Sequence, residues 1–71
     1  MERLLRYSLE HERVIRLMLM RDGQLAQVNA RIIAYDGQKI EFITTRSPRP
    51  QTVERAELLA ADFRKGDDGQ V

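Results

Sequence analysis

Arginines are the side chains of this 71-residue sequence whose type and spacing suggest binding chemistry, with ten arginines against two lysines. Arg46 and Arg49 flank a Ser-Pro pair in a loop stiffened by proline, and Arg55 comes near them if the chain then turns back. Guanidinium groups bind phosphate or carboxylate oxygens in a bidentate manner. We therefore predict that these three arginines bind a small anionic ligand or nucleic acid. The alternative is that they pair with Glu54 and Glu57 and only keep an edge loop hydrated.

A second candidate site is a polar group on one face of the first predicted hairpin. Arg16 and Arg31 lie there with the amides of Gln27 and Asn29, a set that suits nucleotide edges or a nucleic-acid backbone. The alternative is that both arginines pair with acids on neighbouring strands, such as Glu41. The sequence leaves this choice open.

Aromatic residues limit the case for binding single-stranded nucleic acid, because such sites need stacking platforms on an exposed face. The sequence has two tyrosines and two phenylalanines. Phe42 and Phe63 are expected in the core. Tyr35, beside the Asp36-Gly37 turn, is the stacking candidate on the same face as Arg31.

Catalytic and metal-binding groupings are missing from the sequence. His11 is the only histidine and there is no cysteine, and Ser8 and Ser47 have no evident base to activate them. Asp67 and Asp68 lack the ligand spacing of a calcium loop. We therefore expect a protein that is not an enzyme and has no cofactor or metal site.

Composition points to one small domain. A chain of this length buries only about 60% of its unfolded surface, and the formal net charge of +1 gives a weak overall field. The longest apolar stretch, residues 14–20, contains Arg16 and is too short to span a bilayer. We expect one domain over residues 1–65, a disordered tail over 66–71, a cytoplasmic location and no membrane partner.

Residues 2–11 are predicted to form an N-terminal helix. Leu4, Leu5 and Leu9 fall on one stripe of it. A helix of about three turns is too short to be stable alone, so it must pack against the rest of the domain.

A β-hairpin is predicted to follow, with Asp22-Gly23 as a two-residue turn of type I′. The turn sets the register and gives one nearly unbroken apolar face, in which each residue faces its partner: Leu19 and Ala26, Leu17 and Val28, Ile15 and Ala30. We expect this face to be the core.

The opposite hairpin face is mixed, and its apolar members are a candidate interface. They are Val14, Met18, Met20, Leu25 and Ile33. Methionine adapts its shape to partners, and exposed apolar patches commonly mark contact surfaces. Either the N-terminal helix or a homodimer or other protein partner is expected to cover them.

The third strand is predicted within residues 39–46, after the Asp36-Gly37 turn. A loop with an odd number of residues, with Gly37 left-handed, places Ile40 and Phe42 in the core beside Ala34. An even loop leaves Phe42 outside, which wastes the largest apolar group nearby.

Residues 52–63 admit two interpretations. Their apolar residues fall on one helical stripe, which predicts a C-terminal helix and an α+β three-stranded meander with a helix at each end. The competing interpretation is a short strand at Thr52-Val53, a tight turn over 55–57 and a last strand over 58–63. The second gives a mainly β, five-stranded SH3/Sm-like small barrel with an N-terminal helix, because a barrel covers strand edges.

The order of a helix, a hairpin, a strand with a central aromatic residue, and "T-V-x-x-x-x-L" before the last strand resembles the WYL domain. That domain is a bacterial small barrel attached to transcription regulators, and the match spans Leu4 to Phe63. The family's Trp-Tyr-Leu triplet aligns with residues 41–43, where glutamate replaces tryptophan. Gln51 stands where the family has a basic ligand-binding residue, so the ligand role does not carry over there. The resemblance favours the barrel and implies a regulatory binding module.

Overall fold

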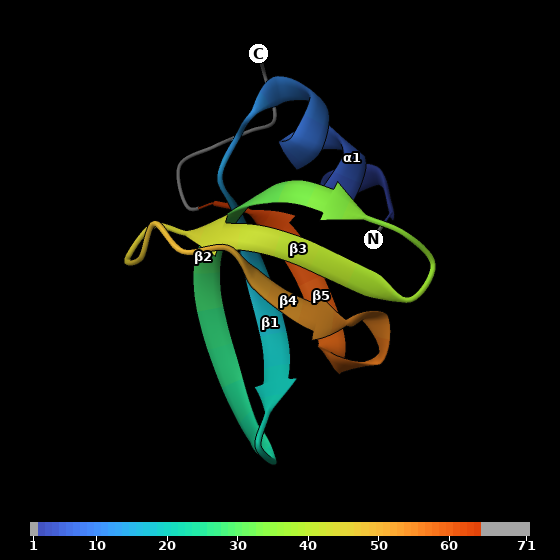
Figure 1. The fold of residues 1–71 in the computed structure, drawn as a ribbon, viewed down its shortest axis with the longest axis vertical. Coiled ribbons are helices and arrows are strands. Elements are labelled where there is room, and N and C mark those ends of the chain that lie inside the picture. Colours follow the sequence, from blue (N-terminus) through green and yellow to red (C-terminus); the bar gives the residue numbers. More distant parts are fainter. Residues whose placement is uncertain (1, 65–71) are drawn as a thin grey trace.

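The computed structural model describes residues 2–64 and is mainly β (Figure 1). Helix α1 is followed by five strands, with the 3₁₀ turn η1 between the last two. Their bounds are α1 Glu2–His11, β1 Ile15–Arg21, β2 Gln24–Tyr35, β3 Lys39–Thr44, β4 Gln51–Glu54, η1 Arg55–Glu57 and β5 Leu58–Phe63. The expected tail over 66–71 lies outside the described residues. In the described part, no helix is long and apolar enough to cross a membrane.

The strands form one open antiparallel sheet in the order β4-β3-β2-β1-β5. The strand-turn-strand interpretation of residues 52–63 is confirmed, and the C-terminal helix is wrong. Glu54 and Glu57 form a reciprocal capping box around η1, which turns the chain after one helical turn. Val53 before the turn and Leu58 after it are both buried, so the apolar stripe of a helix is here divided between two strands.

The predicted register of the first hairpin is confirmed. Leu19 pairs with Ala26, and the pairing continues to Ile15 with Ala30. Asp22 has φ 50° and Gly23 has φ 76°, the two positive angles that a type I′ turn requires. The leucines and Ile15 on the inner face of β1 are fully buried, as expected.

The β2–β3 connection differs from the prediction, although Ile40 and Phe42 are fully buried as expected. Gly37 is not left-handed, because the side chain of Asp36 closes the loop by accepting the N–H groups of Gln38 and Lys39 at 2.7 and 2.8 Å. The register instead changes inside β2. Ile32 pairs with Phe42 and Ala34 with Glu41, which leaves Ile33 as the extra residue of a β-bulge.

The bulge at Ile33 reverses which side chains of β2 point inward beyond it. Tyr35 pairs with Ile40 and packs against the core, while Ala34 is exposed. Placing Tyr35 on the outer face beside Arg31, and Ala34 in the core, was therefore wrong. A prediction that assumes strict alternation of inward and outward side chains along β2 cannot detect this bulge.

Helix α1 covers one end of the inner face, and the turn of the β1–β2 hairpin lies at the opposite end (Figure 1). Leu5 is fully buried among the inner residues of the sheet, whereas Leu9 is 37% exposed. The helix thus completes the core at this end of the sheet, and it does not cover Leu25 beside the turn at the opposite end (Figure 1).

The buried hydroxyl of Ser8 links the helix to the sheet by hydrogen bonds. Ser8 is fully buried; its Oγ donates to the carbonyl of Arg13 at 2.6 Å and accepts the N–H of Ile32 at 2.9 Å. Ile32 lies beyond Ala30, the last β2 residue paired with β1. Ser8 therefore supplies the acceptor that strand β1 no longer provides.

Candidate functional site

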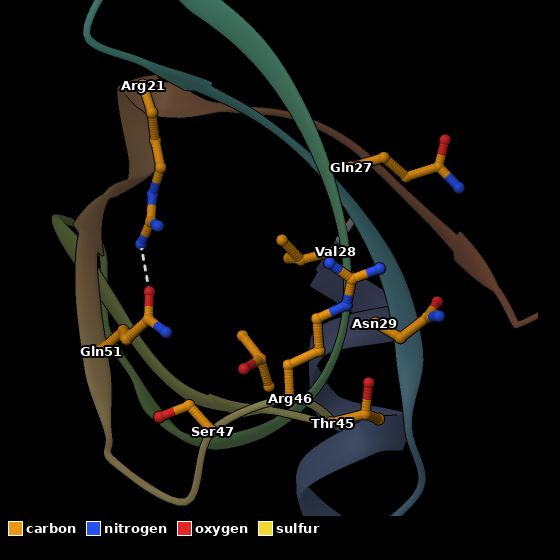
Figure 2. Close-up of a pocket in the computed structure, with 9 residues that line it drawn as sticks. Arg21, Gln27, Val28, Asn29, Thr45, Arg46, Ser47 and Gln51 are labelled. Carbon is orange, nitrogen blue, oxygen red and sulfur yellow. Dashed lines mark hydrogen bonds between the residues drawn. The ribbon is translucent and has the colours of Figure 1, made fainter.

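A polar cup lies between the middle of β2, the end of β3 and the start of β4 (Figure 2). Its volume is about 330 Å³, at the low end of the range for ligand pockets. The residues that line it are Arg21, Gln27, Val28, Asn29, Thr44, Thr45, Arg46, Ser47 and Gln51. They include two guanidinium groups, three hydroxyls, the Gln51 amide and no carboxylate, whereas the side-chain amides of Gln27 and Asn29 lie on the other side of β2 (Figure 2).

Arg21 reaches the cup because strand alternation points it inward. It follows Leu17 and Leu19 on the inner face of β1, one residue before the turn. Gln51 is inward for the same reason, since it pairs with Phe42 at the start of β4. The inner face is thus apolar through most of its length and polar where it opens into the cup.

Arg21 and Gln51 are joined by a short hydrogen bond from Nη2 to Oε1 (Figure 2). Because the oxygen of the Gln51 amide accepts this bond, its NH₂ group remains a donor toward the cup. Arg46 comes from the loop after β3, and its side chain extends along β2 (Figure 2). The cup therefore carries donors from three segments of the chain: the end of β1, the loop after β3 and the start of β4.

The electrostatics of the cup favour an anion. Within residues 2–64, neither Arg21 nor Arg46 has a carboxylate within 4.0 Å, whereas Arg16, Arg31 and Arg55 do. An adjoining hollow is lined by Arg21 together with the acidic residues Asp22 and Glu57. Guanidinium groups stay protonated at all physiological pH values, so the positive charge of the cup is permanent.

The predicted trio of arginines is not brought together. Arg46 lines the cup. Arg49 lies in the same loop, where its backbone N–H donates to the Ser47 hydroxyl at 3.3 Å. Arg55 lies at the other end of the β3–β4 hairpin. Its guanidinium donates to the carbonyl of Asp36 at 2.8 Å and pairs with Glu2. The chain does turn back after β4, but the length of β4 separates Arg55 from the other two arginines.

The second predicted polar group is largely neutralised by ion pairs. Arg16 lies 3.3 Å from Asp62, and Arg31 lies 3.9 Å from Glu12. These partners belong to β5 and to the segment after α1, rather than to Glu41. Figure 2 shows the side chains of Gln27 and Asn29 on the opposite side of β2 from Gln51.

Tyr35 does not offer a free stacking face. It packs against the core, and the guanidinium carbon of Arg55 lies 5.9 Å from its ring centre, a cation–π distance. Arg55 thus fastens Tyr35, the β2–β3 loop and the start of α1 together. This role is structural.

Of the predicted interface residues, Met18, Met20 and Leu25 lie on the outer face of the hairpin, whereas Val14 precedes β1 and Ile33 is the bulged residue of β2. Leu25 is 64% exposed at the hairpin tip, and the other four, Val14, Met18, Met20 and Ile33, are half-buried. Met20 pairs with Leu25 beside the turn. No described element covers Leu25, so this apolar surface is accessible.

Sequence reasoning missed Arg21 and Gln51 as members of the site. The signal for Arg21 was present, because the predicted register already placed residue 21 on the inner face with Leu19. Gln51 was compared with the basic ligand-binding position of the WYL domain and was not assigned to a face of the sheet. Among residues 2–64, no group of three histidine or acidic side chains is placed to hold a metal ion. Comparison of the chain with models of protein families, with curated proteins and with solved structures finds no match.

Proposed function

We propose that this chain is a non-enzymatic binding domain that holds an oxyanion of its ligand, a carboxylate or a phosphate, in the polar cup. The observation that carries the proposal is the pair Arg21 and Arg46, which line the same cup as the Gln51 amide and have no acidic partner within residues 2–64. A hydrogen bond to a charged group contributes about 1.5–3 kcal/mol. Two such groups in a partly enclosed cup suffice for a ligand of modest affinity.

The proposed fold type is a small barrel of the SH3/Sm kind, similar to the WYL domain. The strand order, the single 3₁₀ turn before β5 and the N-terminal helix over one end support this comparison. Such a barrel would serve as an accessory module of a cytoplasmic regulator. The binding role does not depend on this assignment, because it rests on the cup alone.

The test is an NMR titration of the protein with sodium phosphate and with sodium acetate. Binding at the cup shifts the amide signals of Thr45 and Gln51, and it weakens with added salt. Arg46→Gln is expected to raise the dissociation constant about tenfold, which corresponds to the loss of about 1.4 kcal/mol.

Arg16→Gln is the matched control, because that arginine lies outside the cup and is paired with Asp62. Its effect on binding is expected to be small. Equal effects of Arg46→Gln and Arg16→Gln would show that the signal is general charge attraction. Unchanged Thr45 and Gln51 signals with both anions would refute the proposed site.

A second candidate function is self-association through the outer hairpin face. The observation in its favour is the exposure of Leu25 beside Met20, at the end of the sheet opposite to α1 (Figure 1). Sedimentation of the pure protein measures the oligomeric state. Met18→Glu is expected to convert a dimer into a monomer, and a wild-type monomer at high concentration contradicts this candidate.

A further inference from the structure

One edge of β2 is unpaired where the strand passes the cup. Residues 24–30 of β2 all pair with β1 on one side, but on the other side the β2–β3 ladder begins only at Ala30 with Thr44. One more hydrogen bond, from Thr45 N–H to the Asn29 carbonyl at 3.0 Å, ends the contact. Within the described part of the chain, residues 24–28 therefore have a free edge, which we call the β2 edge.

The hairpin register shows which backbone groups point to the β2 edge. Arg21 and Gln24 flank a two-residue turn and form a hydrogen-bonded pair with each other. Alternation then directs the N–H and C=O groups of Leu25 and Gln27 to the opposite side. The carbonyl of Asn29 belongs to the same series, and its bond to Thr45 confirms the direction. The β2 edge thus offers two free donors and two free acceptors.

The β2 edge and the cup are continuous. Gln27, Val28 and Asn29 line the cup from the β2 side, and Arg46 lies along the same strand (Figure 2). A strand added here would alternate its side chains between two surroundings. Its inner side chains would face Arg21 and Arg46, and its outer ones would lie beside the exposed Leu25.

We propose that the ligand of the cup is an extended acidic peptide segment that pairs with the β2 edge as an additional strand. This inference rests on the proposed function, because the carboxylates of the segment are the oxyanions that Arg21 and Arg46 hold. A peptide uses both the donors and the acceptors of a strand edge, whereas a phosphate chain uses only the donors. No exposed aromatic ring lines the cup to stack a base, so the same groups fit a peptide better than nucleic acid.

The probe is the peptide acetyl-Val-Glu-Val-Glu-Val-amide, which alternates carboxylates with apolar side chains. Two N-methylated forms of it separate strand pairing from charge attraction. One carries methyl groups on the two glutamate nitrogens and the other on the three valine nitrogens. A bound strand turns alternate N–H groups toward its partner, so one form is expected to bind like the parent and the other about tenfold more weakly.

Amide hydrogen exchange gives a second readout on the protein. Binding of the parent peptide is expected to slow exchange at Leu25 and Gln27, whose N–H groups point to the β2 edge. Exchange at Ala26 is the internal control, because its N–H already faces β1. Arg46→Gln is expected to weaken the parent peptide about tenfold and to leave a peptide with glutamine in place of glutamate nearly unaffected.

The outcomes distinguish this inference from the proposed function. Equal binding of the two N-methylated forms, or no protection of Leu25 and Gln27, overturns strand pairing even if the anion site is real. Binding of phosphate or of a short oligothymidylate at Thr45 and Gln51 without peptide binding overturns the peptide inference and leaves the proposed function standing. If none of these probes shifts Thr45 or Gln51, both proposals fail.

Discussion

Replacing Ser8 by alanine tests whether one hydroxyl holds the helix to the sheet. The change removes the Oγ atom that bonds the carbonyl of Arg13 and the N–H of Ile32. The bond to Ile32 is buried and the bond to Arg13 is partly buried, and Ser8 itself is fully covered. The N–H of Ile32 then loses the Ser8 acceptor in a place that water reaches poorly.

The expected cost follows from that geometry. A buried backbone group left without a partner costs about 1–3 kcal/mol, and the loss of the partly buried bond to Arg13 adds about 0.5–1.5 kcal/mol, so the expected cost is roughly 1.5–4.5 kcal/mol. A domain of this length has a total unfolding free energy of roughly 4–11 kcal/mol. We therefore expect Ser8→Ala to remove a substantial fraction of the unfolding free energy and to lower Tm by at least about 6 °C.

Urea unfolding followed by circular dichroism measures the effect. Ser47→Ala is the matched control, because the Ser47 hydroxyl accepts only the exposed N–H of Arg49 at 3.3 Å, and its loss is expected to cost at most about 0.5 kcal/mol. If Ser8→Ala and Ser47→Ala lower the unfolding free energy equally, the helix is not anchored through Ser8 and the reasoning is wrong.

Three further perturbations test other parts of the fold. Gly23→Ala is expected to lower the unfolding free energy by about 1 kcal/mol in thermal unfolding, because φ is +76° and only backbone strain opposes the new methyl group. Gly37→Ala is the control: this glycine has neither a positive φ nor a close neighbour, so the change is expected to be neutral or slightly stabilising. Phe42→Ala is expected to cost about 3–5 kcal/mol and to show partial unfolding at room temperature by circular dichroism, because the ring is fully buried. The N–H groups of Gln38 and Lys39 hold the pKa of Asp36 below its usual value of 3.8. The ionised carboxylate therefore contributes its full stabilisation of the fold above pH 3.8, and this contribution is lost as the pH falls through the lowered pKa. An NMR titration of Asp36 measures the pKa, and an unshifted value contradicts the loop geometry.

Most of the fold was predictable because the first hairpin has strong local signals. Asp22-Gly23 sets a unique turn, and the alternation on both sides of it places Leu17 and Leu19 inward. The second Asp-Gly pair was misread, since the same dipeptide closes its loop through the Asp36 side chain instead of through a left-handed Gly37. Two identical dipeptides thus form different turns, and only the surrounding chain decides between them.

The candidate site was predictable only in part. Arg46 could be found from its loop, but its partners depend on how far β4 runs before η1. Gln51 and Arg21 meet because β1 ends and β4 begins at the cup, while Arg55 follows β4 at its other end. Such meetings are set by strand lengths and sheet order, which composition and spacing do not specify.

The extra residue at Ile33 has a consequence for comparing this chain with others. Because it reverses the facing of every later residue in β2, a protein with a similar string of residues but without that insertion would bury Ala34 and expose Tyr35. A gap of one residue at this point therefore matters more than several substitutions elsewhere. A sequence alignment without this gap would pair residues whose side chains lie on opposite faces of the sheet.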